Sequence, residues 1–224
     1  GNPTSAALEA KVTAMEGGIG TVTFATGMAA IGAIMLALLK AGDHVVCSQS
    51  MFGSTIKLIG SDMAKFGVES TFVPQTDVDA WRAAVRPNTK LFFGETVGNP
   101  GLDVLDTPTV AAMAHEAGVP LLVDSTLTSP YLVKPFDQGA DLVYHSATKF
   151  LSGHGTVVGG IVVDGGSFDW DQSGKFAELS QAYDGFHNMV FSEESTVGAF
   201  LLRARREGLR DFGACMSPHT AWLI

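Results

Sequence analysis

Short apolar runs alternate with stretches of helical periodicity along most of this chain. The run at residues 119–123 is almost continuously apolar, and residues 107–118 before it have a helical pattern that ends at a glycine. Apolar strands that alternate with helices are typical of a parallel sheet covered on both faces. We therefore predict an α/β fold with a mostly parallel sheet flanked by helices. Further strands are predicted at residues 21–25, 44–47, 71–73, 91–93, 141–144 and 160–163, and further helices at 28–39, 56–66 and 78–85.

The last part of the chain lacks this regular alternation. Residues 165–189 are polar and aromatic, which favours a long surface segment. Apolar residues then recur at helical spacing, which predicts one helix from about residue 192 to 212. With 224 residues, the chain is long enough for one large domain with a substantial core.

The charged residues are dispersed and mostly acidic. Lys and Arg number 14 and Asp and Glu number 23, so the formal net charge is −9. A nucleic-acid-binding protein needs a basic face, so we expect no nucleic-acid partner. Arg203, Arg205, Arg206 and Arg210 lie close together, and we interpret them as the solvated face of the last predicted helix.

The cysteine and histidine spacings match no metal or disulfide pattern. Cys47 and Cys215 lie far apart and outside any C-x-x-C pair, and the 6 histidines have no metal-binding spacing. We therefore expect a cytoplasmic protein with no bound metal. The most apolar segment, residues 28–39, is too short to span a bilayer, and the chain does not open with a signal-peptide pattern, so no membrane partner is expected.

The clearest chemical pattern is the group Ser146, Thr148 and Lys149, directly after a predicted strand. Hydroxyl and backbone N–H groups can hold a phosphate, and a lysine amine can bond covalently to an aldehyde. This combination favours a site for pyridoxal phosphate (PLP). A lysine at the surface with no such role is the common alternative.

Two other strand ends carry residues that suit the same cofactor. Thr26-Gly27-Met28 joins a strand to a helix, whose N-terminus attracts phosphate, although ordinary turns have the same pattern. Asp124 follows the strand at 119–123, where a carboxylate can pair with a pyridine nitrogen or serve as a turn residue. Ligands bind at the carboxyl ends of parallel strands, so these residues are expected to meet there.

Gly153-His154-Gly155 resembles part of a dinucleotide-binding fingerprint. A strand, and not a helix, is predicted after it, which is the opposite of the order in a Rossmann phosphate turn. A NAD-dependent enzyme is therefore a distant alternative.

In combination, the motifs resemble those of the PLP-dependent enzymes of cysteine and methionine metabolism, the transsulfuration family. Within that family the chain is most similar to the homoserine-ester sulfhydrylases, and the resemblance runs essentially from end to end. The motifs that carry it are Asn2-Pro3-Thr4, Thr26-Gly27-Met28-Ala29-Ala30, Phe52-Gly53-Ser54-Thr55, Glu95 with Asn99-Pro100, Asp124-Ser125-Thr126, His145 to Lys149, Gly153-His154-Gly155 and Ser217-Pro218.

The resemblance implies a role for each matching residue. Lys149 would carry the cofactor covalently and shuttle protons, and Asp124 would pair with the pyridine nitrogen. Phe52 would stack on the ring, Thr126 would lie near it, and Asn99 would contact its phenolic oxygen. The phosphate would be held by Gly27, Met28, Ser146 and Thr148.

The resemblance also implies a fold and a domain organisation. Residues 1–224 would be the PLP-binding large domain of the aspartate-aminotransferase-like (fold type I) enzymes. Family members usually have a tyrosine and an arginine just before the Asn-Pro-Thr motif, and a C-terminal domain whose arginine binds the substrate carboxylate. The expectation is therefore that the N-terminal arm and the C-terminal substrate domain are absent from this chain.

The implied activity is γ-replacement on an O-acyl-homoserine, with O-acetylhomoserine favoured, by sulfide or a thiol to give homocysteine or methionine. Phe52, where many relatives have tyrosine, weighs mildly against the lyases because it cannot donate a proton. The alternatives in the family are O-succinylhomoserine sulfhydrylase, cystathionine γ-synthase and methionine or cystathionine γ-lyase. An inactive PLP-binding fragment is the alternative of another class. Relatives build the site across a dimer, which implies a homodimer or homotetramer.

Overall fold

A computed structural model describes residues 2–224, whose strands form one mixed sheet of 7 strands in the order β1-β7-β6-β5-β4-β2-β3. The predicted α/β fold with a mostly parallel sheet is confirmed. The strands are β1 Gly20–Phe24, β2 His44–Ser48, β3 Glu69–Val73, β4 Thr89–Glu95, β5 Leu121–Asp124, β6 Leu142–Ser146 and β7 Gly160–Asp164.

The direction of β7 determines whether β1 runs parallel or antiparallel to the other strands. Strands β2 to β6 pair in parallel, whereas β7 pairs antiparallel with both β6 and β1. Because β1 and β6 each run opposite to β7, they run parallel to one another. The carboxyl end of β1 therefore lies at the same edge of the sheet as the carboxyl ends of β4, β5 and β6.

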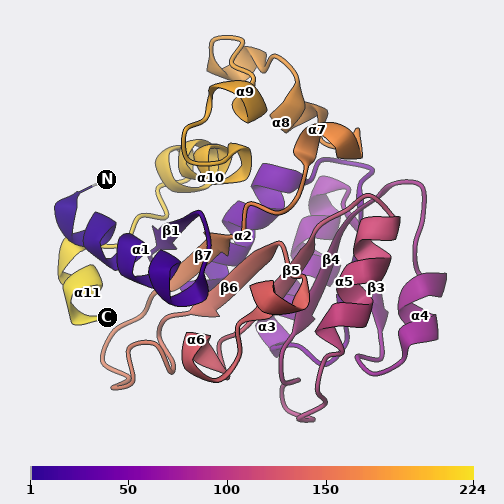
Figure 1. Ribbon diagram of the computed structural model, residues 1–224, viewed down its shortest axis with the longest axis horizontal. Coiled ribbons are helices and arrows are strands. Elements are labelled where there is room, and N and C mark those ends of the chain that lie inside the picture. Colours follow the sequence, from indigo (N-terminus) through magenta and orange to yellow (C-terminus); the bar gives the residue numbers. More distant parts are fainter. Residues whose placement is uncertain (1) are drawn as a thin grey trace.

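Helices cover both faces of the sheet, as Figure 1 shows. Helices α2 and α10 pack on one face, α4 and α5 pack over the centre of the other face, and α1 packs beside α11 over its β6–β7 end. The α-helices are α1 Pro3–Glu16, α2 Gly27–Leu38, α3 Gly53–Lys57, α4 Val78–Ala83, α5 Thr107–Glu116, α6 Ser129–Leu132, α7 Trp170–Ser173, α8 Ala177–Ser180, α9 Phe191–Glu194, α10 Ala199–Ala204 and α11 Pro218–Leu223. Shorter π- and 3-10 segments are η1 Leu58–Asp62, η2 Met63–Phe66, η3 Pro135–Gln138, η4 Asp184–Phe186 and η5 Arg205–Asp211.

The continuous apolar character of the strands follows from this two-sided covering. Successive residues point to opposite faces, so Leu122 packs with α2 whereas Leu121 and Val123 pack with α5. Leu121, Leu122 and Val123 are all fully buried. A strand buried on both faces has no position for a polar side chain until it reaches the edge of the sheet.

The single helix predicted at about 192–212 is wrong. A short α9 ends at Glu194, and a separate helical segment starts at Ala199 and continues as η5. Gly198 between them has φ 94, a left-handed conformation that a continuous helix does not allow. The hydroxyl of Ser195 donates to the Gly198 carbonyl and stabilises this break.

The long surface segment predicted at 165–189 is also corrected. It contains α7, α8 and η4, and it buries Trp170, Phe176 and Leu179 against α2 and α10. The Trp170 and Phe176 rings meet edge to face, with an interplanar angle of 88° and centroids 5.0 Å apart. Their sequence separation matches neither a strand nor a long helix, which is why periodicity missed them.

The first helix, α1, was not predicted from the sequence. Asn2 caps it by accepting the backbone N–H of Ser5 at 2.9 Å, and Pro3 occupies its first turn. Its buried apolar side chains, Leu8 and Val12, form a narrow stripe that gives little helical periodicity.

All four clustered arginines were predicted to lie on a solvated helix face, and for three of them this is wrong. Arg203 is buried, binds Glu207, and lies over the Tyr183 ring at 4.8 Å. Arg205 is half-buried, and the guanidinium of Arg206 covers the Phe186 ring at 4.3 Å. The fourth, Arg210, is exposed as predicted.

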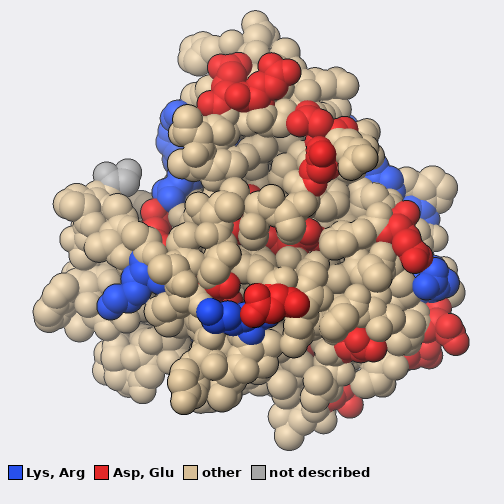
Figure 2. Space-filling model, viewed as in Figure 1, with Lys and Arg blue, Asp and Glu red and all other residues tan. Residues whose placement is uncertain are grey.

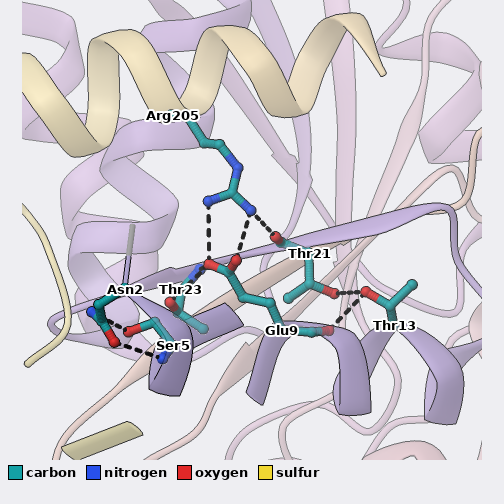
Figure 3. A network of polar contacts seen from close by, with 7 residues as sticks. All are labelled: Asn2, Ser5, Glu9, Thr13, Thr21, Thr23 and Arg205. Atoms are coloured by element: carbon teal, nitrogen blue, oxygen red, sulfur yellow. Dashed lines mark hydrogen bonds and ion pairs between the residues drawn. The ribbon is translucent and has the colours of Figure 1, made fainter. Parts of the chain in front are cut away.

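Arg205 joins the edge strand β1 to helix α1 (Figure 3). Its guanidinium donates to the Glu9 carboxylate at 2.7 Å and to the Thr21 carbonyl at 2.7 Å. Glu9 also accepts the backbone N–H of Thr23 at 3.0 Å. These side chains satisfy backbone groups on the free edge of β1, which would otherwise be open to pairing with another chain.

The surface carries dispersed charge. On the face in Figure 2, red acidic and blue basic side chains are scattered over a mostly uncharged surface. No helix within residues 2–224 is both long and apolar enough to cross a membrane.

We predict that Arg205→Ala lowers the free energy of unfolding by about 2 kcal/mol, because it leaves the mostly buried Glu9 carboxylate and the Thr21 carbonyl without this donor. Urea denaturation followed by circular dichroism measures the change. Arg82→Ala is the control, since the Arg82–Glu116 pair is exposed and is expected to contribute less than about 0.5 kcal/mol. Equal losses in both variants would contradict the role of Arg205.

Candidate active site

A cavity of about 370 Å³ opens at the carboxyl edge of the sheet, where β1, β4, β5 and β6 end. All nine residues predicted from the sequence line it: Gly27, Met28, Phe52, Asn99, Asp124, Thr126, Ser146, Thr148 and Lys149. The cavity is also lined by residues to which the sequence assigned no contact with the cofactor: Thr26, Glu95, Leu127, Tyr144, Phe150 and Val158.

Helix α2 points its N-terminus at this cavity. The Thr26 hydroxyl caps the helix by accepting the Ala29 N–H at 3.0 Å. The first backbone N–H groups of the helix, those of Gly27 and Met28, have no partner within the helix. They provide the positive end of a helix dipole for an anion such as phosphate.

Two glycines allow β1 and α2 to approach β6. A Cβ on Gly27 would lie 2.2 Å from the Tyr144 hydroxyl oxygen, and a Cβ on Gly160 would lie 2.1 Å from the Thr26 carbonyl oxygen. Gly160 is the β7 residue that pairs with both Phe24 and Ser146. Only a residue without a side chain fits between these strand ends, so the residues of α2 and β6 that are predicted to bind phosphate face one cradle.

The hydroxyls near Lys149 are held by the backbone around them. The Ser146 N–H donates to the Thr126 hydroxyl at 2.8 Å, which links the ends of β5 and β6. The Thr148 hydroxyl accepts the Gly159 N–H at 3.1 Å and donates to the Gly159 carbonyl at 3.3 Å. To donate to a phosphate, Thr148 has to give up the longer of these two bonds.

Asp124 lies at the buried end of the cavity. Its carboxylate accepts the Thr126 N–H at 2.9 Å, and burial raises its pKa to about 6. Hydrogen bonds from Thr126 and the charge of the nearby His145 ring oppose that rise in pKa. A buried carboxylate at this position gains most from a cationic partner, and a protonated pyridine nitrogen is such a partner.

The His145 ring is held on the other side of the sheet by α1. Its Nε2 lies 2.5 Å from the Glu16 Oε1, and both side chains are fully buried. The sequence had placed His145 only within a motif. Its partner is 129 residues away in the chain, so no local pattern could have identified the pair.

Glu95 is the residue of most chemical interest that the sequence did not assign to the cofactor. It ends β4, pairs in register with Asp124 on β5, and is only 2% exposed. Burial and the negative charge of Asp124 raise the pKa of Glu95 to about 8. Its position directly after a buried strand, the same feature that identified Asp124, could have indicated it.

Lys149 and Phe52 line the more open part of the cavity. Lys149 is exposed. Its backbone N–H donates to the Ser146 carbonyl at 3.1 Å, so Lys149 lies one turn of the chain after Ser146. Phe52 is 48% exposed and lines the cavity. An amine, a helix N-terminus with hydroxyls, a buried carboxylate and an open aromatic ring are the groups that PLP requires, and the residues present fit that cofactor.

The family model described as "Cys/Met metabolism PLP-dependent enzyme" matches residues 1–224. The chain belongs to this family. Membership confirms the predicted family and the predicted PLP cofactor.

Curated relatives of the chain have consistent names. It is 44% identical to an O-acetyl-L-homoserine sulfhydrylase of Leptospira meyeri and 42% identical to one of Corynebacterium glutamicum, over 100% and 99% of the chain. A homocysteine/cysteine synthase of Saccharomyces cerevisiae is 36% identical over 100% of the chain. The chain spans about half the length of these relatives, 52%, 52% and 51%.

Solved structures have the same fold. A putative O-acetylhomoserine (thiol)-lyase of Campylobacter jejuni superposes with a TM-score of 0.93 at 29% identity, covering 99% of this chain and 55% of that one. That structure carries a pyridoxyl-lysine monophosphate. O-acetylhomoserine sulfhydrylase of Wolinella succinogenes gives a TM-score of 0.86 at 37% identity, covering 99% and 60%.

We predict that Gly27→Ala destabilises the chain by about 1–3 kcal/mol and weakens PLP binding, because its new methyl group overlaps the Tyr144 hydroxyl. Urea denaturation and a fluorescence titration with PLP measure both effects. Gly32→Ala on the same helix is the control. Nothing lies within 4 Å of its Cβ position, so it is expected to stabilise the helix by about 0.5–1 kcal/mol. A normal PLP affinity in Gly27→Ala would contradict the close approach.

We predict that Asp124→Asn stabilises the ligand-free chain above pH 7 while it weakens PLP binding. The pKa of Asp124, about 6 in the folded chain, exceeds its unfolded value of about 4, so its stabilising contribution is present at low pH and is lost as the pH rises through 6. Removing the charge therefore gains on the order of 2 kcal/mol at pH 7.5 and little at pH 4.5. Urea denaturation at both pH values measures this.

Asp164→Asn is the matched control for that prediction. Burial also raises the pKa of Asp164 to about 6, but this residue lies outside the cavity. It should show the same pH dependence of stability with unchanged PLP affinity. An Asp124→Asn variant that binds PLP normally would contradict the assignment of the carboxylate.

Proposed function

We propose that this protein acts in a PLP-dependent γ-replacement: the acetyl ester of O-acetyl-L-homoserine is exchanged for sulfide or a thiol. One C–O bond at the γ-carbon breaks to release acetate, and one C–S bond forms there to give homocysteine or methionine. The observation that carries the proposal is the single cavity lined by all the predicted PLP contacts, in a chain 44% identical to an O-acetyl-L-homoserine sulfhydrylase.

Each wall of the cavity has a task in this proposal. PLP supplies an electron-accepting ring, which stabilises negative charge at the carbon beside the substrate amine. Lys149 holds the cofactor and then removes and returns a proton at that carbon. Asp124 keeps a positive charge on the ring nitrogen, which increases the electron demand of the ring.

The remaining residues orient the cofactor. The N–H groups of Gly27 and Met28 and the Ser146 hydroxyl would bind the phosphate, and Thr148 would contribute if its hydroxyl gave up the Gly159 carbonyl. Phe52 packs on one face of the ring. Asn99 would hydrogen-bond the phenolic oxygen, and Thr126 would lie beside the ring. The residues that position the cofactor in this proposal and do not react with it are Gly27, Met28, Phe52, Asn99, Thr126, Ser146 and Thr148.

We further propose that residues 1–224 are the PLP-binding large domain of a homodimer or homotetramer with small-molecule substrates. Phe150 and Val158 line the cavity mouth and are 63% and 53% exposed, as suits a site that another chain covers. The unpaired Cys47 and Cys215 support a reducing, cytoplasmic compartment.

We predict that Lys149→Ala abolishes the yellow absorbance that develops when PLP is added, because no other amine lines the cavity within residues 2–224. Absorbance spectra after gel filtration test this. Lys134→Ala changes an exposed lysine outside the cavity and is the control. A yellow Lys149→Ala protein would show that the cofactor attaches elsewhere.

Assays of the PLP-loaded, unmodified chain distinguish the sulfhydrylase activity from the alternatives. Homocysteine formed from O-acetyl-L-homoserine and sulfide supports the proposal. Methanethiol released from methionine alone, with no homocysteine from the ester, would favour a γ-lyase. PLP uptake without turnover of any homoserine ester would favour a binding fragment without activity.

A further inference from the structure

We propose that Glu95 is a positioning residue of the PLP site, which couples the charge at Asp124 to the placement of the Phe52 ring. The proposal rests on the function proposed above, because it assumes that a cationic ring nitrogen binds at Asp124. Glu95 lines the cavity but is not one of the nine residues predicted to contact the cofactor.

The first link is a direct hydrogen bond. The Phe52 backbone N–H donates to the Glu95 Oε2 at 3.0 Å. Phe52 caps α3 without using a side chain, and its carbonyl accepts the N–H groups of Thr55 and Ile56 at 2.8 and 3.2 Å. Glu95 therefore holds the residue at which α3 begins, and with it the ring that faces the cavity.

The second link is electrostatic. Glu95 and Asp124 pair in register on adjacent parallel strands, so their side chains leave the sheet on the same face. Both are buried, at 2% and 5% exposed. Two carboxylates this close, in a poorly solvated place, do not both ionise readily, and near neutral pH the pair holds about one proton.

The other titratable groups around the pair do not neutralise it. On β6, Tyr144 has a raised pKa, through burial and then the charge of Asp124, and so stays uncharged. His145 lies beyond the sheet against Glu16, and it lowers the pKa of Asp124 less than burial raises it. Lys149 lies at the open side of the cavity.

These two links act in the same direction. A positive charge placed beside Asp124 offsets its negative charge and so favours ionisation of Glu95. An ionised carboxylate binds an N–H about twice as strongly as a neutral carboxyl group does. Binding of a cationic ring nitrogen beside Asp124 would therefore release a proton from Glu95 and strengthen the hydrogen bond from the Phe52 N–H to Glu95.

The test follows the Phe52 amide proton by NMR in the chain labelled with ¹⁵N-phenylalanine, with the resonance assigned from Phe52→Leu. In the ligand-free chain the chemical shift should change with a midpoint near pH 8, since the pKa of Glu95 is raised to about 8. Asp124→Asn should move that midpoint to lower pH, and Glu95→Gln should abolish the change. Asp164→Asn, a buried carboxylate outside the cavity, should leave the midpoint unchanged.

A second measurement uses PLP itself. Saturating PLP should lower the Phe52 midpoint by one pH unit or more in the unmodified chain. Glu95→Ala should weaken PLP binding about tenfold and change the circular dichroism of the bound cofactor, because Phe52 loses a hydrogen bond to a charged group. Glu95→Gln, whose amide oxygen still accepts the N–H, should retain the dichroism and bind within about threefold of the unmodified chain.

The outcomes separate this proposal from the one on which it rests. A Phe52 resonance that does not titrate, or a midpoint that is the same in Asp124→Asn, overturns the coupling. Unchanged PLP affinity and dichroism in Glu95→Ala overturns the positioning role. An unmodified chain that takes up no PLP but shows the expected titration overturns the proposed function and leaves the Glu95–Phe52 link established.

Discussion

The approach of β1 and α2 to the end of β6 is the contact around which the cavity is built. It depends on β7, which runs antiparallel between β1 and β6 and so makes them parallel to each other. It also depends on Gly160, where any side chain would strike the Thr26 carbonyl. Without this geometry the N-terminus of α2 and the hydroxyl of Ser146 would not face a common anion site.

The cavity combines this rigid cradle with an electrostatically unfavourable interior. Asp124 and Glu95 stand side by side at buried strand ends, and the pKa of each is raised, to about 6 and about 8. Their mutual repulsion opposes folding of the ligand-free chain, and a bound cation relieves it. The arrangement is therefore understandable as preparation for a charged ligand, since the fold alone gains nothing from it.

Much of the fold and part of the site could be predicted from local sequence. Apolar runs such as the one around Leu122 predicted the strands because two-sided burial excludes polar residues until the sheet edge. The same exclusion made Asp124 conspicuous directly after a strand. Glu95 occupies an equivalent position, yet an isolated carboxylate has no local feature that reveals a second carboxylate on the next strand.

Where prediction failed, the deciding contact was distant in the chain. Arg205 was assigned to solvent because it belongs to a basic cluster in a helical pattern, but Glu9, 196 residues away, binds it. Trp170 and Phe176 were assigned to the surface because their spacing fits no regular element, although they pack into the core with α2 and α10. Gly198 did not predict the helix break, since a glycine inside a helical pattern is often tolerated.

The sequence by itself determined the alternation of strands and helices and the residue types available at each strand end, because both follow from local burial and backbone preference. It therefore determined which groups the chain can offer to PLP. The tertiary structure alone decided which of them are neighbours: Glu95 beside Asp124, His145 against Glu16, and Gly27 against Tyr144. Charge and steric interactions depend on distance in space, and that distance is set only when the strands take their order in the sheet.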